Sequence, residues 1–102
     1  MYLRVTVNTI ERDSAGELRH VIQEMTDHRQ QAGYTPVEWL MGLTGRPDQL
    51  ISVQRYERLA DYEAGLDRIA HDPPYQALLA RLKACTVAGA GQVLLLQSYE
   101  RE

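Results

Sequence analysis

Histidine is the one residue type whose side chain ordinarily titrates near neutral pH, and this chain has 3 of them. His71 stands directly before Asp72 and is a candidate general base, because its unperturbed pKa would be about 6.5. His20 and His28 lie on one predicted helix, two turns and a fraction apart. That spacing does not place two metal ligands on one face, so we expect surface histidines there and no metal.

The sequence shows no other common catalytic pattern: no nucleophile beside a base, no carboxylate pair at a motif spacing and no cluster of metal ligands. Cys85 precedes a small-residue loop without a neighbouring histidine, so we expect a packed thiol. The chain has 6 Tyr, 1 Trp and no Phe. Because a buried tyrosine normally finds a hydrogen-bond partner, this composition predicts either tyrosines at the edges of the core or a pocket with hydroxyl-bearing aromatic walls.

Length and charge narrow the class of protein. The 102 residues are enough for one domain, residues 1–102, with a modest core that gains from oligomerisation. A net charge of −3 with scattered basic residues argues against a nucleic-acid partner. No apolar run approaches the roughly 20 residues of a membrane span, and Met1 leads straight into a predicted strand, so we expect neither a membrane segment nor a signal peptide. The single cysteine suits a reducing compartment, which predicts a cytoplasmic location.

The elements that must position these residues begin with a strand over 2–10, in which apolar and polar residues alternate. Ser14 and Glu17 form a capping-box pattern at the start of a long helix, which Gly33 ends. Residues 35–43 and 50–56 predict two strands joined by a turn at 44–48. Pro36, near the start of the first of them, suggests either a sheet edge or an entry point.

From residue 57 the apolar spacing changes to three and four, which predicts a helix over 59–70. Asp72 and the two prolines after it end that helix, and Asp72 can cap a second helix with Pro73 at its first position. A last strand over 92–99 contains a continuous apolar run, which predicts a central or covered position.

The order strand, helix, strand, strand, helix, strand predicts an α+β, ferredoxin-like βαββαβ fold with a four-stranded antiparallel sheet and helices on one face. The face of the sheet without helices must then be covered by another molecule or be polar. We expect the polar residues of the first strand to lie on this face, and we expect a homodimer in which a second copy covers them. Those residues are Tyr2, Arg4, Thr6 and Asn8.

The chain resembles the dimeric α+β barrel proteins, most closely the NIPSNAP-like branch. The resemblance is carried by Trp39, the LISVQRY strand over 50–56, the helix from Arg58, and the Asp72-Pro73-Pro74-Tyr75 break, which is similar to the family's D-P-x-aromatic element. It implies a dimer with a pocket between sheet and helices in each subunit. It also implies activities as different as cofactor-independent monooxygenation, cyclisation, haem degradation and none at all.

Haem-degrading relatives use an Asn on the first strand, a Trp on the helix after the third strand and a His on the next helix. Asn8 matches the first position, but residues 59–70 hold no Trp and residues 75–84 hold no His. We therefore expect no haem, and no other cofactor or metal.

The cofactor-free oxygenases use Asn, Trp, Tyr, His and Arg to orient and ionise a phenol. By that resemblance the catalytic candidates are His71 and Asn8, and the ligand-binding candidates are Arg4, Trp39 and Tyr56. Each of four also has a structural interpretation. His71 would end a helix, Trp39 would fill the core or an interface, Arg4 would pair with Glu38, and Asn8 would make a turn contact.

Two functions remain open at this point. The first is the binding or transformation of a small apolar or aromatic molecule, in the manner of a cofactor-independent monooxygenase or cyclase. The alternative is a non-catalytic dimerisation or accessory protein. A well-formed pocket with convergent polar groups would favour the first, and a subunit interior filled with side chains would favour the second.

Overall fold

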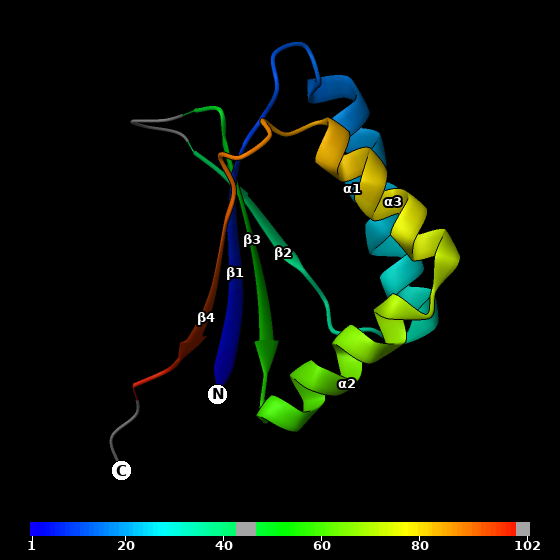
Figure 1. Ribbon diagram of the computed structural model, residues 1–102, viewed down its shortest axis with the longest axis vertical. Coiled ribbons are helices and arrows are strands. Elements are labelled where there is room, and N and C mark those ends of the chain that lie inside the picture. The colour runs from blue at the N-terminus through cyan, green and yellow to red at the C-terminus, as the bar shows by residue number, and fades with distance from the viewer. Residues whose placement is uncertain (43–46, 100–102) are drawn as a thin grey trace.

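The computed structural model describes residues 1–42 and 47–99 and contains one antiparallel sheet with three helices. The elements follow one another as β1 (Tyr2–Thr9), α1 (Ala15–Ala32), β2 (Glu38–Met41), β3 (Gln49–Tyr56), α2 (Leu59–Ala70), α3 (Pro73–Ala84) and β4 (Gln92–Gln97). The strand order is β2-β3-β1-β4, and the helices lie on one side of the sheet (Figure 1). The predicted ferredoxin-like α+β fold and the β2–β3 hairpin are confirmed.

Two strand predictions need correction. The second strand begins at Glu38 rather than at residue 35, after Pro36, and it does lie at a sheet edge. Residue 43 and most of the predicted turn at 44–48 are outside the described residues. β4 lies at the other edge of the sheet, so of the two predicted alternatives, a central or a covered position, the central one is wrong. Its apolar side chains Val93, Leu95 and Leu96 are each about half exposed in the single chain.

The sequence prediction placed the polar face of β1 away from the helices, and the structure places it toward them. Arg4 and Thr6 lie on the face that looks toward the helices, where they line a cavity. Val5 lies on the other face, between Val53 of β3 and Leu94 of β4. The polar residues can face the helices because a cavity, rather than packed side chains, occupies part of that space.

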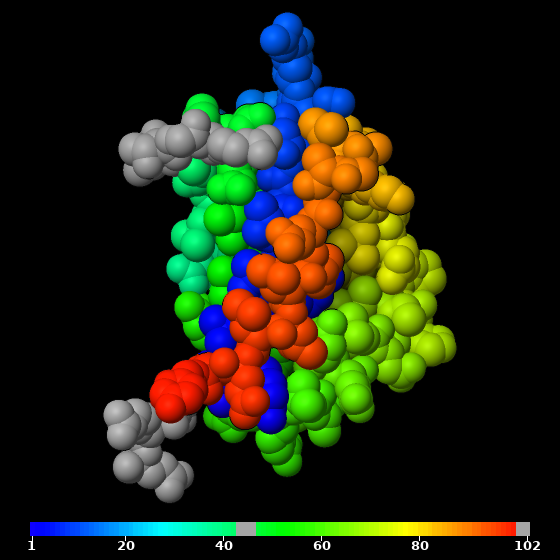
Figure 2. All heavy atoms as spheres, turned by 60° about the vertical axis from the view of Figure 1, so that its left-hand side comes forward, coloured from blue at the N-terminus to red at the C-terminus, as the bar shows by residue number. Residues whose placement is uncertain are grey.

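We call the uncovered side the open sheet face. All four strands contribute apolar residues to it, and it also carries the ion pair of Arg55 and Glu38. No helix lies in front of β1, β3 and β4 when it is viewed from that side (Figure 2). By strand register its apolar residues are Leu3, Val5, Val7, Leu40, Ile51, Val53, Leu94 and Leu96.

The core lies where α1 and α3 cross the sheet side by side (Figure 1). One cluster joins Leu18 of α1, Leu50 of β3 and Cys85, and the other joins Val21 and Met25 of α1 to Tyr75 of α3. The packed position of Cys85 confirms the sequence prediction, and burial raises the pKa of its thiol.

The helix ends follow the sequence signals at two of three predicted places. Gly33 ends α1 with φ 74°, the left-handed conformation that glycine adopts without strain. Asp72 caps α3 by accepting a hydrogen bond from the Tyr75 backbone N–H at 3.2 Å. Ser14 makes no side-chain cap hydrogen bond within the described residues, and its backbone has φ −96° and ψ 2° rather than the extended N-cap conformation. The Glu17 half of the capping box is also absent, because the Ser14 N–H donates to the Glu11 carbonyl oxygen at 3.2 Å and Arg81 binds the Glu17 carboxylate at 2.7 and 3.0 Å.

Within the described part of the chain, no helix has both the length and the hydropathy that crossing a membrane requires.

Candidate functional site

A cavity of about 310 Å³ lies between the sheet and the helices. Its floor is polar and comes from the two central strands. The residues of the floor are Arg4, Thr6 and Asn8 of β1 and Ser52, Gln54 and Tyr56 of β3. Its roof is mainly apolar and comes from the three helices, including Met25, Ile69, Tyr75, Leu79 and Leu82. Trp39 of β2 and Val93 of β4 lie on the two flanks.

The floor is ordered by hydrogen bonds between neighbouring strands and within β3. The hydroxyls of Thr6 and Ser52, which lie opposite each other in the sheet, are hydrogen-bonded. The Tyr56 hydroxyl donates to Gln54 Oε1 at 3.0 Å, and its ring meets Tyr62 edge-on with the centroids 5.4 Å apart. Because the Gln54 oxygen is engaged, its amide N–H groups remain as donors beside the cavity.

Asn8 is held at the end of the floor by a close approach of Gly91. A Cβ atom added to Gly91 would lie 2.6 Å from Asn8 Oδ1, far inside van der Waals contact. Only glycine therefore leaves the Asn8 amide in its present position.

We expect Gly91→Ala to turn the Asn8 amide away while changing the free energy of unfolding by less than about 1 kcal/mol, since the clash is with the free end of a side chain. The Asn8 side-chain N–H resonances in a ¹H–¹⁵N spectrum should shift. Gly16→Ala is the control, because no atom lies within 4 Å of the added Cβ. Unmoved Asn8 resonances would show that the chain accommodates the methyl group elsewhere.

The structure brings four of the five predicted site residues to this cavity: Arg4, Asn8, Trp39 and Tyr56. His71 is not among the residues that line it. His71 ends α2, its side chain is 77% exposed, and its Nδ1 lies 2.8 Å from the Asp67 carbonyl oxygen. The helix-end interpretation therefore describes its position.

Arg4 does not form the predicted pair with Glu38. Arg55 of β3 binds that carboxylate instead, at 2.8 Å. The reason is the pleat: Arg4 lies opposite Gln54, on the cavity face, whereas Arg55 and Glu38 lie on the open sheet face. The Arg4 Nε atom is buried and has no hydrogen-bond partner in the described structure.

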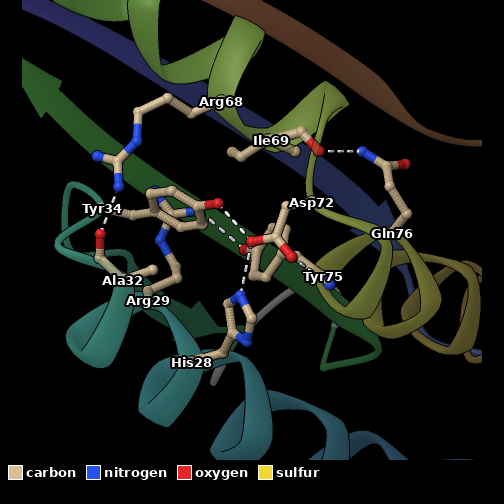
Figure 3. A network of polar contacts seen from close by, with 9 residues as sticks. All are labelled: His28, Arg29, Ala32, Tyr34, Arg68, Ile69, Asp72, Tyr75 and Gln76. Carbon is tan, nitrogen blue, oxygen red and sulfur yellow. Dashed lines mark hydrogen bonds and ion pairs between the residues drawn. The ribbon is translucent and has the colours of Figure 1, made fainter.

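Beside the cavity, a polar network joins α1 to the break between α2 and α3 (Figure 3). His28 Nε2 lies 2.7 Å from Asp72 Oδ2, and the Tyr34 hydroxyl donates to the same oxygen. Arg29 donates to the Thr35 carbonyl oxygen and, at 2.8 Å, to the Tyr75 hydroxyl. Sequence reasoning missed this network, because no spacing signals a contact between residues 44 positions apart. The surface position predicted for His28 holds only in part, since its side chain is 26% exposed and contacts Asp72.

The network shifts the pKa values of Asp72 and Tyr34 in opposite directions. Hydrogen bonds from Tyr34 first and His28 second lower the pKa of the Asp72 carboxyl group. The hydrogen bond to Asp72, followed by burial, raises the pKa of the Tyr34 phenol. Both shifts keep Asp72 ionised and Tyr34 protonated near neutrality.

Because the folded-state pKa of Asp72 lies below its unfolded value of about 3.9, its ionised form stabilises the fold above that pH. The contribution is lost as the pH falls below about 4 toward the folded pKa. Asp72→Asn keeps a capping oxygen but loses the charge. We expect its Tm to lie roughly 4–8 °C below wild type at pH 7, with the gap closing below about pH 4.

Thermal melts across pH 7 to 3 test this expectation. Glu63→Gln, at an exposed position of α2, should melt with the wild type at pH 7. A gap for Asp72→Asn that stays constant down to pH 3 would mean that its charge does not carry the stabilisation.

The chain has a ferredoxin-like α+β fold with a cavity between its sheet and its helices. No family model matches the chain, and no curated protein matches it. Solved structures do match, over almost its whole length. An uncharacterised NIPSNAP domain protein from Burkholderia xenovorans is 16% identical, with 97% of this chain and 95% of that chain covered and a TM-score of 0.77.

Two further solved structures are similar to this chain. A NIPSNAP family protein from Agrobacterium tumefaciens is 16% identical over 99% of this chain and 88% of its own, with a TM-score of 0.77. An antibiotic biosynthesis monooxygenase is 12% identical over 98% of this chain and 100% of its own, with a TM-score of 0.76. At these identities the likeness shows a shared fold.

Proposed function

We propose that this protein binds, and transforms, a small apolar or aromatic molecule in the cavity between its sheet and its helices. The observation that carries the proposal is the arrangement of the cavity, a polar floor facing an apolar roof within about 310 Å³. Small-molecule sites have this character, since apolar surface supplies affinity and a few polar groups fix orientation. The size is at the lower end of the usual range of about 300–1,000 Å³, which favours a compact ligand.

The chemistry that the cavity supports best is the stabilisation of an anion. Arg4 brings a positive charge, and the amides of Asn8 and Gln54 bring neutral donors. A cation favours the ionised form of an acidic group that lies beside it. Amide donors can stabilise the anion of a phenol or enol, which is the form that reacts with oxygen or cyclises. The described residues of the lining include no His, Asp or Glu, so the proton would pass to water. His71 is outside the proposed site.

The structural neighbours support the same class, because one of them is an antibiotic biosynthesis monooxygenase. We therefore propose a reaction like that of the cofactor-independent monooxygenases or cyclases. Among the described residues no group of three or more His, Cys, Asp or Glu is placed to hold a metal ion.

We further propose a homodimer in which a second copy covers the open sheet face. The support is the composition of that face, to which all four strands contribute apolar residues, and the exposure of Leu40 (42%) and Leu96 (45%) at its flanks. Apolar surface of this extent normally lies against a partner. The single, buried Cys85 is consistent with the cytoplasmic location that we propose.

The open sheet face also favours the second candidate, a non-catalytic dimerisation or accessory protein. In that case the cavity would hold only water. Filling the cavity would then not change how the Tm responds to added small molecules. The two candidates therefore differ in what happens when the cavity is filled.

A thermal-shift screen with small aromatic acids, amides and phenols tests the proposal. We expect at least one compound to raise the Tm of the wild type by several degrees through mass action. Leu79→Trp, which adds bulk to the roof, should abolish that response. Leu59→Trp is the matched control at an exposed position of α2 and should keep it. An absent response, or an equal response in both variants, would favour the accessory protein.

A further inference from the structure

The charge of the cavity is opposite to the charge of the chain. The whole sequence has 14 acidic and 11 Lys or Arg residues. The described residues that line the cavity include the three basic residues Arg4, Arg29 and Lys83, and no acidic residue. A positive cavity in an acidic protein indicates that the cavity attracts an anion.

Arg29 is already committed to the fold. It is 4% exposed, and its Nε donates to the Thr35 carbonyl oxygen while a terminal nitrogen donates to the Tyr75 hydroxyl, both at 2.8 Å. Its guanidinium also lies 5.5 Å from the centroid of the Tyr75 ring. These contacts hold Arg29 in place. Arg29 therefore adds positive electrostatic potential to the cavity, but its N–H groups are not available to bind a ligand.

Arg4, unlike Arg29, has a donor that no described residue accepts from. Its Nε is buried without an acceptor, and no described residue forms an ion pair with its guanidinium. Its neighbours across the sheet are Gln54 on one side and Leu95 on the other, neither of which is acidic. Arg4 as a whole is half-buried, but its Nε is a buried donor without a partner, which is costly. The geometry therefore indicates an acceptor that the described chain does not supply.

The surroundings of Arg4 fit a small acid. A guanidinium presents its N–H groups as a planar fork that matches the two oxygens of a carboxylate. One uncommitted guanidinium balances a single negative charge, which favours a carboxylate over a phosphate dianion. The roof above the floor, with Ile69 and Leu79, offers apolar surface to the rest of the molecule.

We propose that the ligand is a small aromatic or apolar monocarboxylic acid, bound as its carboxylate by Arg4 with its apolar body against the helix roof. The inference rests on the proposed function, since it names the ligand class of the same cavity. Lys83 is exposed and lines the cavity, so it adds long-range attraction for the anion.

The test uses matched pairs of ligands that differ in charge alone: benzoic, cinnamic and 2-naphthoic acids and their primary amides. Calorimetric titration at pH 7 should show at least one acid binding at least 10-fold more tightly than its amide. Arg4→Met, which keeps an unbranched stem as far as the Nε position and removes the charge, should weaken the binding of that acid by about 10- to 100-fold and change the affinity of the amide by less than about 3-fold. Arg19→Met, at an exposed position of α1, removes the same charge and should leave both affinities unchanged.

The outcomes separate the two levels of the proposal. Amides that bind as tightly as their acids, or an acid affinity that survives Arg4→Met, would overturn the carboxylate assignment and leave the ligand site standing. If no member of any pair binds to the wild type, the ligand site itself is overturned. Should Arg4→Met fail to fold, the acid-to-amide ratio of the wild type still decides the question, because it needs no variant.

Discussion

Arg29→Met should lower the free energy of unfolding by about 3 kcal/mol, since it removes a guanidinium that donates to one buried and one partly buried acceptor. The substitution leaves the Thr35 carbonyl oxygen and the Tyr75 hydroxyl without their donors. Each unsatisfied buried group costs about 1–3 kcal/mol. Methionine fills most of the volume, so the loss reports on hydrogen bonds rather than on a cavity.

Urea unfolding measures this change, with Arg19→Met as the control on the exposed side of the same helix. Surface substitutions of that kind usually stay within about 0.5 kcal/mol. A loss below about 1 kcal/mol for Arg29→Met would mean that water replaces the guanidinium at both acceptors. The junction between α1 and the α2–α3 break would then depend on Asp72 rather than on Arg29.

Val5→Glu should convert the proposed dimer to a monomer, raising its dissociation constant by at least about 100-fold. Val5 lies at the centre of the open sheet face, between Val53 and Leu94. In a free chain the new carboxylate points into water and costs little. In a two-fold interface both copies would bury it without a partner, which is expensive.

Sedimentation at micromolar concentration tests both parts. The wild type should sediment at twice the 11.6 kDa of the chain, with the interface burying more than about 1,200 Å² in total. Gln31→Glu adds the same charge at an exposed position of α1 and should leave the dimer intact. A wild type that sediments as a single chain would refute the dimer, and an intact Val5→Glu dimer would place the interface elsewhere.

The spacing of apolar residues and the residues that cap or end helices predict most of this fold. The alternation of 2–10 and 50–56, the stop at Asp72-Pro73-Pro74 and the cap at Gly33 each have a local physical cause, and each is found in the structure. Local patterns cannot say which side of a strand the helices cover. The polar side of β1 was therefore assigned to the partner, whereas it forms the floor of the cavity.

The candidate site was predictable to the extent that it lies on strands. Arg4 and Asn8 share a face because they are an even number of residues apart, and strand pairing brings Tyr56 and Trp39 to the same face. His71 was placed with them by residue type, through the resemblance to the cofactor-free oxygenases and its ability to act as a base near neutral pH, and neither reason carries information about position. The contacts of His28 with Asp72 and of Gly91 with Asn8 join distant parts of the chain, and only the folded structure reveals them.

The most direct test of the ligand site uses Trp39, the only tryptophan of the chain and a residue of the cavity flank. Protein labelled with 5-fluorotryptophan has a single ¹⁹F resonance, which absorbance by an aromatic ligand does not disturb. Titration with the acid that most raises the Tm should shift this resonance, saturating at the dissociation constant found by calorimetry. A resonance that stays unmoved while the same acid stabilises the protein would place binding outside the cavity and contradict the site proposed for this chain.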